Sequence, residues 1–146
     1  MSVNAYWFSE DERIIRFDFF GDWTWQEFYL AFEQSQQMRA AVSGRVDTII
    51  DMSSSGRLPN NVLSHLVRVT SRVSKNPGLA VVVSSDRFIL ALYQASTRMY
   101  RQVAKRFRIA PTVAESLVTI HAERGGGRDA RRSTMEMFTI SRANGD

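Results

Sequence analysis

The spacing of hydrophobic residues along this chain switches repeatedly between the period of a strand and the period of a helix. In residues 14–20, Ile15, Phe17 and Phe19 fall on one face of an extended chain, while the polar residues between them fall on the other. Two later segments are continuously apolar and rich in β-branched residues, which indicates strands buried on both faces of a parallel sheet. The predicted strands are residues 5–8, 14–20, 46–52, 79–84 and, as a short edge strand, 107–109.

Helical spacing of apolar residues follows each strand after the first. Thr24 and Glu27 form the sequence pattern of a capping box, and Thr112 with Glu115 repeats this pattern near the end of the chain. Pro59 falls in the first turn of another predicted helix. The predicted helices span about residues 25–41, 58–75, 88–107 and 112–124. The predicted buried stripe of the long third helix comprises Leu92, Ala95, Met99, Val103 and Phe107.

Strands that alternate with helices favour parallel pairing through right-handed crossovers. The predicted fold class is therefore α/β, with a single-layer mixed sheet of four to five strands and alternating helices. Residues 1–124 are predicted to form this one domain. Three glycines and a charged run follow, so residues 125–146 are predicted to be a flexible or loosely docked C-terminal tail. Within it, residues 135–140 form either one more strand or part of that tail.

The order of elements and two segments of sequence resemble the STAS domain, the fold of the anti-anti-sigma factors and of small bacterial STAS-like proteins. The segments are IIDMSSSG at residues 49–56 and LAVVVSSDRF at residues 79–88, and the resemblance covers about residues 5–122. It implies a non-catalytic regulatory or protein-interaction domain. In the family, an aspartate precedes a phosphorylatable serine in the loop after the strand. Here Asp51 matches the strand-end aspartate, and no Asp-Ser pair follows before Leu58. Small lipid-binding domains of the Sec14 type are distantly similar.

Polar side chains follow both continuously apolar strands at the points where they end. Carboxyl ends of adjacent parallel strands meet at one edge of a sheet, where open α/β sheets usually place their sites. We predict a binding or regulatory site here, in which the aspartate accepts backbone amides. The serines bind or carry an anion or phosphate near a helix start, and the arginine neutralises it. The alternative is a polar loop that caps the helix, with Gly56 at a positive φ. The candidate residues are Asp51, Ser53, Ser54, Ser55 and Arg57, with Ser84, Ser85 and Asp86 beside them.

Eight aromatic residues crowd into residues 17–32, more than the buried faces of a strand and a helix readily hide. Phe20, Trp23 and Tyr29 are predicted to be partly exposed and are the candidate residues of a homodimer interface. An apolar pocket beneath the aromatic cluster is the alternative use, and it would make the protein a carrier of a small molecule or lipid.

Charge is unevenly distributed. Residues 1–51 contain four arginines against nine acidic residues, whereas the rest contains fifteen basic against six acidic residues. Two predicted helix faces are basic, and they either bind an acidic partner or an anionic membrane surface or remain solvated. No recognition motif accompanies them, so nucleic-acid binding is not predicted. These faces comprise His65, Arg68, Arg72 and Lys75 on one helix, and Arg98, Arg101, Lys105 and Arg108 on the other.

Several chemistries are absent from the sequence. There are no cysteines, and the two histidines stand without partners at metal-ligand spacing. No nucleophile-elbow, phosphate-loop or dinucleotide motif is present, so we predict neither an enzyme nor a cofactor or metal site. No apolar run is long enough for a transmembrane segment, and the N-terminus lacks a secretory signal pattern. We therefore predict a cytoplasmic protein whose partners are another protein, a second copy of itself, or a small anion or lipid.

Overall fold

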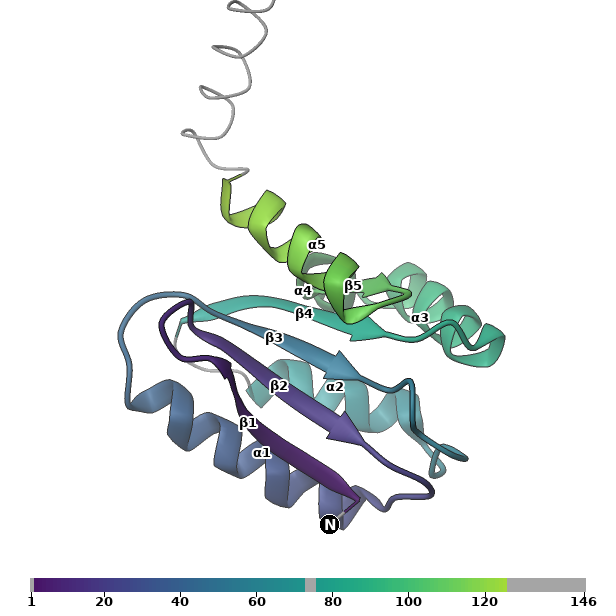
Figure 1. The fold of residues 1–146 in the computed structure, drawn as a ribbon. Helices are drawn as coiled ribbons and strands as arrows, with labels where there is room; N and C mark the ends of the chain where they lie inside the picture. Colours follow the sequence, from purple (N-terminus) through teal and green to yellow (C-terminus); the bar gives the residue numbers. More distant parts are fainter. Residues whose placement is uncertain (1, 73–75, 126–146) are drawn as a thin grey trace, which may run out of the picture.

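The computed structural model describes residues 2–72 and 76–125. Within them, one five-stranded sheet has the strand order β1-β2-β3-β4-β5; β1 and β2 pair antiparallel, and every other pair is parallel. The predicted α/β class with one mixed sheet and alternating helices is thus confirmed (Figure 1). The elements are β1 (Val3–Ser9), β2 (Ile14–Phe19), α1 (Trp25–Ala40), β3 (Val46–Asp51), α2 (Val62–Arg72), β4 (Pro77–Val83), α3 (Arg87–Met99), α4 (Arg101–Arg106), β5 (Phe107–Ala110) and α5 (Val113–Gly125).

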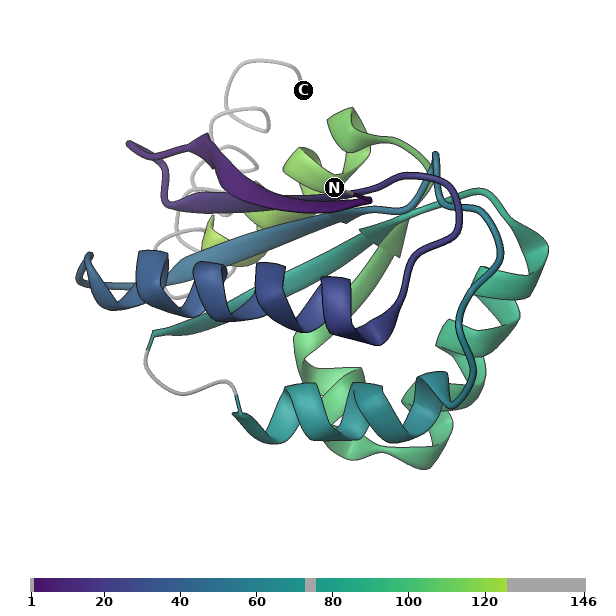
Figure 2. The ribbon, with the colours of Figure 1, turned by 90° about the horizontal axis from the view of Figure 1, so that it is seen from below.

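The two faces of the sheet have different covers. Helices α1 and α2 lie on one face and α5 on the other, as Figures 1 and 2 show from two directions. Because successive strand residues point to opposite faces, Ile15 packs on the α1 side and Ile14 packs on the α5 side. Helix α5 lies over β3, β4 and β5. On that face Tyr6 and Phe8 of β1 remain exposed.

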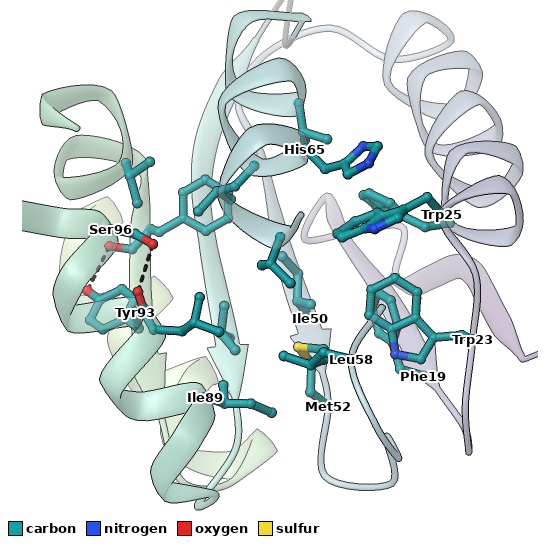
Figure 3. Close-up of a pocket in the computed structure, with 18 residues that line it drawn as sticks. Phe19, Trp23, Trp25, Ile50, Met52, Leu58, His65, Ile89, Tyr93 and Ser96 are labelled. Atoms are coloured by element: carbon teal, nitrogen blue, oxygen red, sulfur yellow. Dashed lines mark hydrogen bonds between the residues drawn. The ribbon is translucent and has the colours of Figure 1, made fainter. Parts of the chain in front are cut away.

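An aromatic cluster forms much of the core between the sheet and α1. The rings of Phe19 and Trp23 lie 4.8 Å apart, and those of Trp23 and Trp25 lie 5.0 Å apart (Figure 3). Phe28 of α1 contacts all three rings. The predicted capping box positions this helix: the Thr24 hydroxyl accepts a hydrogen bond from the Glu27 amide, and the Glu27 carboxylate accepts one from the Thr24 amide.

The second helix begins later than predicted. It starts at Val62 rather than at Leu58, and the chain before it is a loop. Pro59 disfavours a helical conformation at the preceding residue. Tertiary hydrogen bonds then hold the loop in place, because Trp25 Nε1 donates to the carbonyl of Asn60 and the Arg57 amide donates to Asp22.

The predicted long helix over residues 88–107 is two helices, α3 and α4, with Tyr100 between them in an extended conformation. This break changes the buried stripe, because residues beyond it no longer continue the direction of α3. Val103 and Phe107 are buried as predicted, whereas Ala95 and Met99 are exposed and Ser96 is buried instead. Predictions for Lys75 and for residues 126–146, including a strand at 135–140, lie outside the described residues.

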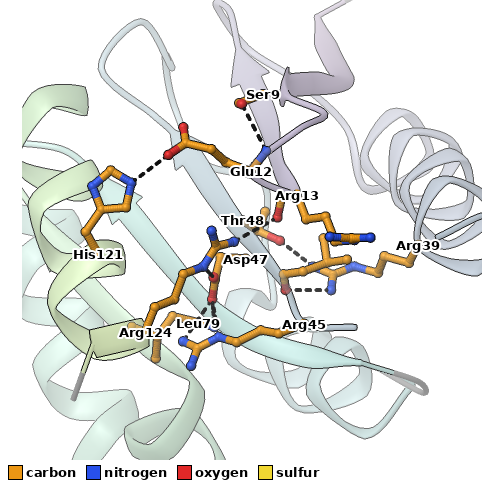
Figure 4. A network of polar contacts seen from close by, with 11 residues as sticks. Ser9, Glu12, Arg13, Arg39, Arg45, Asp47, Thr48, Leu79, His121 and Arg124 are labelled. Carbon is orange, nitrogen blue, oxygen red and sulfur yellow. Dashed lines mark hydrogen bonds and ion pairs between the residues drawn. The ribbon is translucent and has the colours of Figure 1, made fainter. Parts of the chain in front are cut away.

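A buried ionic cluster connects β3, β4 and α5 at the amino-terminal ends of the parallel strands (Figure 4). The Asp47 side chain is 0% exposed and accepts hydrogen bonds from the Leu79 amide at 2.7 Å, from Arg45 Nε at 3.0 Å and from Arg124 Nε at 2.5 Å. A Cβ at Gly78 would collide with Asp47 Oδ1, so the glycine permits this close approach.

We expect Asp47→Asn to lower the free energy of unfolding by about 3 to 5 kcal/mol, because it leaves two arginines without their buried counter-charge. Urea denaturation followed by tryptophan fluorescence measures the loss. Glu33→Gln is the matched control, since Glu33 and Arg72 form an ion pair in which both side chains are about half exposed; it should cost less than about 1 kcal/mol. Equal losses in the two variants would contradict a structural role for the Asp47 cluster.

Candidate functional site

The loops after β3 and β4 meet at the carboxyl edge of the sheet, because these strands pair in parallel and Met52 N donates to the Val83 carbonyl at 3.0 Å. They form the two walls of an open groove of about 670 Å³. Phe88, 64% exposed, also lines it. Six of the eight candidate residues line this groove: Ser53, Ser55, Arg57, Ser84, Ser85 and Asp86.

Hydrogen bonds within the groove walls give both loops a defined shape. Ser55 Oγ accepts from Trp23 Nε1 at 2.9 Å. On the other wall Ser84 Oγ accepts from the Asp86 amide, and the Asp86 carboxylate caps α3 by accepting from the amides of Phe88 and Ile89. The capping role of Asp86 was not part of the sequence prediction, although an Asp before a helical pattern is a usual N-cap signal.

The other two candidate residues, Asp51 and Ser54, line a separate small hollow on the face of the sheet opposite α1. Arg16 of β2 pairs there with Asp51 at 2.7 Å and with Asp18 at 2.7 Å. Arg16 and Asp18 were not among the site residues predicted from the sequence. Their polar, alternating positions on β2 placed them on this face, but only the parallel pairing of β2 with β3 brings them to Asp51.

Asp51 holds the serine loop as predicted, since its Oδ1 accepts from the Ser53 amide at 3.0 Å and from the Ser53 hydroxyl at 2.6 Å. Two other expectations for the loop are wrong. The serines do not lie at a helix N-terminus, because α2 begins only at Val62. Gly56 does not have a positive φ; it is required because a Cβ there would lie 2.9 Å from the carbonyl carbon of Gly21.

The three candidate interface residues do not share one surface. Phe20 is 48% exposed and lines the hollow beside Ser54. Trp23, predicted to be partly exposed, is only 6% exposed, because its ring packs in the aromatic cluster and its N–H is bonded to Ser55. Tyr29 is partly buried on α1, and its hydroxyl is hydrogen-bonded to His65 Nδ1 at 2.8 Å.

An apolar cavity of about 160 Å³, partly open to the surface, lies between the sheet, α1, α2 and α3 (Figure 3). Aromatic rings from the cluster form one wall, and Leu66 and Val69 of α2 with Leu92 of α3 form another. No residue of α2 is fully buried, although the helix has a distinct apolar face. The apolar face of α2 is therefore turned toward a cavity that side chains of the described residues do not fill.

His65 connects α2 to α1 at the rim of this cavity. Its ring stacks on Trp25 at a centroid distance of 4.1 Å, in addition to its hydrogen bond with Tyr29. Removal from water and the charge of Arg68 lower the pKa of His65. The lowered pKa favours the neutral imidazole, which can stack on Trp25 without burying a charge.

Within residues 2–72 and 76–125, no three or more histidine, aspartate or glutamate side chains gather where they could hold a metal ion. In the same ranges, no helix has the length and apolar composition needed to cross a membrane. Comparisons of the chain with protein-family models, curated proteins and solved structures find no match. Its function is therefore inferred from the contacts of its own residues.

Tyr6 of β1 extends the hollow's polar network, since its hydroxyl donates to Asp18 at 2.5 Å. Burial, this hydrogen bond and the negative charge of Asp18 raise the pKa of Tyr6 to about 12. Because the folded-state value lies above the ordinary value of 10, the contribution of Tyr6 to stability is complete below pH 10. It is lost as the pH rises through about 12.

We expect ultraviolet titration of the folded protein, with the Tyr6→Phe trace subtracted, to give a phenol that ionises near pH 12. In Asp18→Asn the same phenol should ionise closer to pH 10, because the charge that opposes phenolate formation is gone. Circular dichroism at each pH confirms that the protein remains folded. A Tyr6 phenol that titrates near pH 10 in the folded wild-type protein would contradict the network.

Proposed function

We propose that this chain is a STAS-like, non-catalytic regulatory domain that binds a protein partner through the groove between the loops after β3 and β4. One observation supports the proposal most directly: the groove brings together six polar residues predicted from the ends of two separate strands. The exposed ring of Phe88 beside them adds an apolar contact, and aromatic residues set among polar groups are typical of protein interfaces.

The hydrogen bonds of the groove favour binding over catalysis. The Ser55 hydroxyl is bonded to Trp23, and the Asp86 carboxylate is occupied by the amides at the start of α3. Both histidines are engaged elsewhere, His65 with Tyr29 and His121 with Glu12. A serine nucleophile requires a base within hydrogen-bond reach, and these two histidines are not placed to act as one in the groove.

Phosphorylation of Ser54 would provide the regulation that the proposal includes. Ser54 is exposed, and the described residues provide no hydrogen bond to its hydroxyl. The hollow beside it already contains two carboxylates, Asp18 and Asp51, against the one guanidinium of Arg16. A phosphate on Ser54 would add negative charge to this cluster and compete with the two carboxylates for Arg16. Both effects would displace the loop, whose other side lines the groove.

The proposal predicts position-specific contact with one partner in the native host. A photo-crosslinking residue at Ser85, inside the groove, should give a discrete adduct that mass spectrometry identifies as one protein. The same residue at Glu123, exposed on α5, is the matched control and should not give this adduct. When the same chain also carries Ser54→Glu, the yield of the adduct from position 85 should fall several-fold. Identical adducts at both positions, or no adduct from the folded protein, would count against the interaction role.

A second candidate function is the carriage of a small apolar molecule, and the cavity under α2 is the observation that favours it. Interiors of proteins are normally packed with few voids larger than a water molecule. This partly open cavity of about 160 Å³, lined by Trp25, Phe28 and Leu92, is comparable in volume with an engineered enclosed apolar cavity of about 150 Å³ that remains dry and binds benzene. An apolar ligand would restore the contacts that its walls lack.

Native mass spectrometry after gentle purification tests the carrier function. We expect the wild-type protein to retain a small molecule in a one-to-one ratio. Val69→Trp, which adds a large side chain to the cavity wall, should give only the mass of the protein itself. Circular dichroism confirms that the variant is folded. A ligand-free mass for the wild-type protein, under conditions that keep it folded, would remove this candidate.

A further inference from the structure

A second cavity of about 100 Å³ adjoins the apolar cavity; it is also mostly apolar, but polar side chains reach its wall. The two cavities have part of their walls in common. Its remaining walls combine the apolar residues Phe17, Phe32 and Ala80 with the polar residues Ser35, Gln36 and Arg39 of α1 and Thr48 of β3. The two spaces together thus form one largely apolar volume that has a single guanidinium, that of Arg39, at one end. The shared wall residues are Phe19, Phe28, Ile50, Val69 and Phe107.

Arg39 is the cation that lines this space, and in the described part of the chain no carboxylate lies within ion-pair distance of it. Its guanidinium donates to the Val46 carbonyl at 3.1 Å and to the Thr48 hydroxyl (Figure 4). Asp47 lies between these two residues in sequence, but it points to the opposite face of the sheet, where Arg45 and Arg124 pair with it.

The electrostatic state of Arg39 reflects this lack of a counter-charge. Burial lowers the pKa of Arg39 to about 10; the charge of Asp47 across the sheet opposes the shift, and the charge of Arg106 adds to it. A largely buried cation without a paired anion is costly, and a bound anion would relieve that cost.

Two other buried donors lack acceptors in the part of the chain that the structure describes, and one of them, Gln36, lines this space. Gln36 Nε2 and Arg106 Nη1 are buried, and no hydrogen-bond partner for either lies within the described residues. Buried donors in folded proteins are almost always paired, so an unpaired donor at a cavity wall indicates a missing acceptor. Gln36 and Arg39 line the same cavity from successive turns of α1.

We infer that the two cavities together bind a small apolar monocarboxylic acid, with its body among the aromatic rings and its carboxylate bonded to Arg39 and Gln36. The inference rests on the carrier function proposed above and adds the chemical class of the ligand. One guanidinium lines this volume, which matches one negative charge better than a doubly charged phosphate. The larger cavity has about the size that accommodates a benzene ring, so a body of roughly six carbons fits it.

Matched acids and alcohols separate the contribution of charge from that of apolar burial. The probes are octanoate with 1-octanol, and 4-phenylbutyrate with 4-phenyl-1-butanol, titrated at pH 7.5 and followed by calorimetry. We expect each acid to bind about ten- to a hundredfold more tightly than its alcohol, because hydrogen bonds to a charged group are the stronger ones. The two pairs also show whether the body of the ligand is a chain or a ring.

Arg39→Gln should reduce this preference for the acid to less than about threefold while leaving the affinity for the alcohol unchanged. Arg98→Gln, which removes one charge from the exposed surface of α3, is the matched control and should keep the full preference. Because Arg39 also connects α1 to β3, Arg39→Gln removes a structural contact as well as a charge. Gln36→Leu is therefore a second variant, and it removes only a side-chain amide whose donor has no hydrogen-bond partner among the described residues. It should weaken acid binding several-fold and leave alcohol binding unchanged.

Equal affinity of acid and alcohol in the wild-type protein would overturn the inference but not the carrier function, because the cavities would then bind apolar molecules irrespective of their charge. No binding of any of the four probes by the folded protein would overturn both the inference and the carrier function. Acid binding that persists at full strength in Val69→Trp would place the probes outside the two cavities and would also overturn the inference.

Discussion

Parallel hydrogen bonding between β3 and β4 determines where each candidate site lies. At the amino-terminal ends of these strands, it places Asp47 against the Leu79 amide, where α5 adds Arg124. At the carboxyl ends, it brings the loop of Ser53 beside the loop of Ser84 and so forms the groove. Between the ends, β3 and β4 provide the floor of the two cavities beneath α1 and α2. The buried Asp47 cluster and the groove therefore lie at opposite ends of the strand pair β3 and β4.

The groove and the apolar cavity are not independent, because Met52, Leu58 and Ile89 line both of them. A molecule in the cavity and a partner in the groove would contact opposite sides of the same three side chains. Packed side chains adjust in discrete steps rather than continuously, so filling one space constrains the shape of the other. The proposed carriage of a small acid and the proposed binding of a protein partner are thus compatible with each other.

Most strands and the first capping box could be predicted from the sequence because their causes are local. Strand residues such as Ile15 and Phe17 alternate with polar ones. The side chains of Thr24 and Glu27 accept hydrogen bonds from amides at the start of the helix, which have no partner within the helix itself. Predictions from local patterns were wrong where residues distant in the sequence determine the structure. Trp25 and Asp22 hold residues 57–60 in a loop, and the break at Tyr100 exposes Met99, which the helical period had placed in the core.

By itself, the sequence determined the α/β class, a mixed sheet of four to five strands and the convergence of two polar strand ends, since hydrophobic period and turn residues encode these features. Only the tertiary structure decided the chemistry within reach of each residue. Arg16 meets Asp51 because β2 pairs with β3, and Arg39 meets an apolar cavity because α1 crosses beneath the sheet. Such contacts join residues far apart in the chain, and no local pattern of hydrophobic and polar positions specifies them.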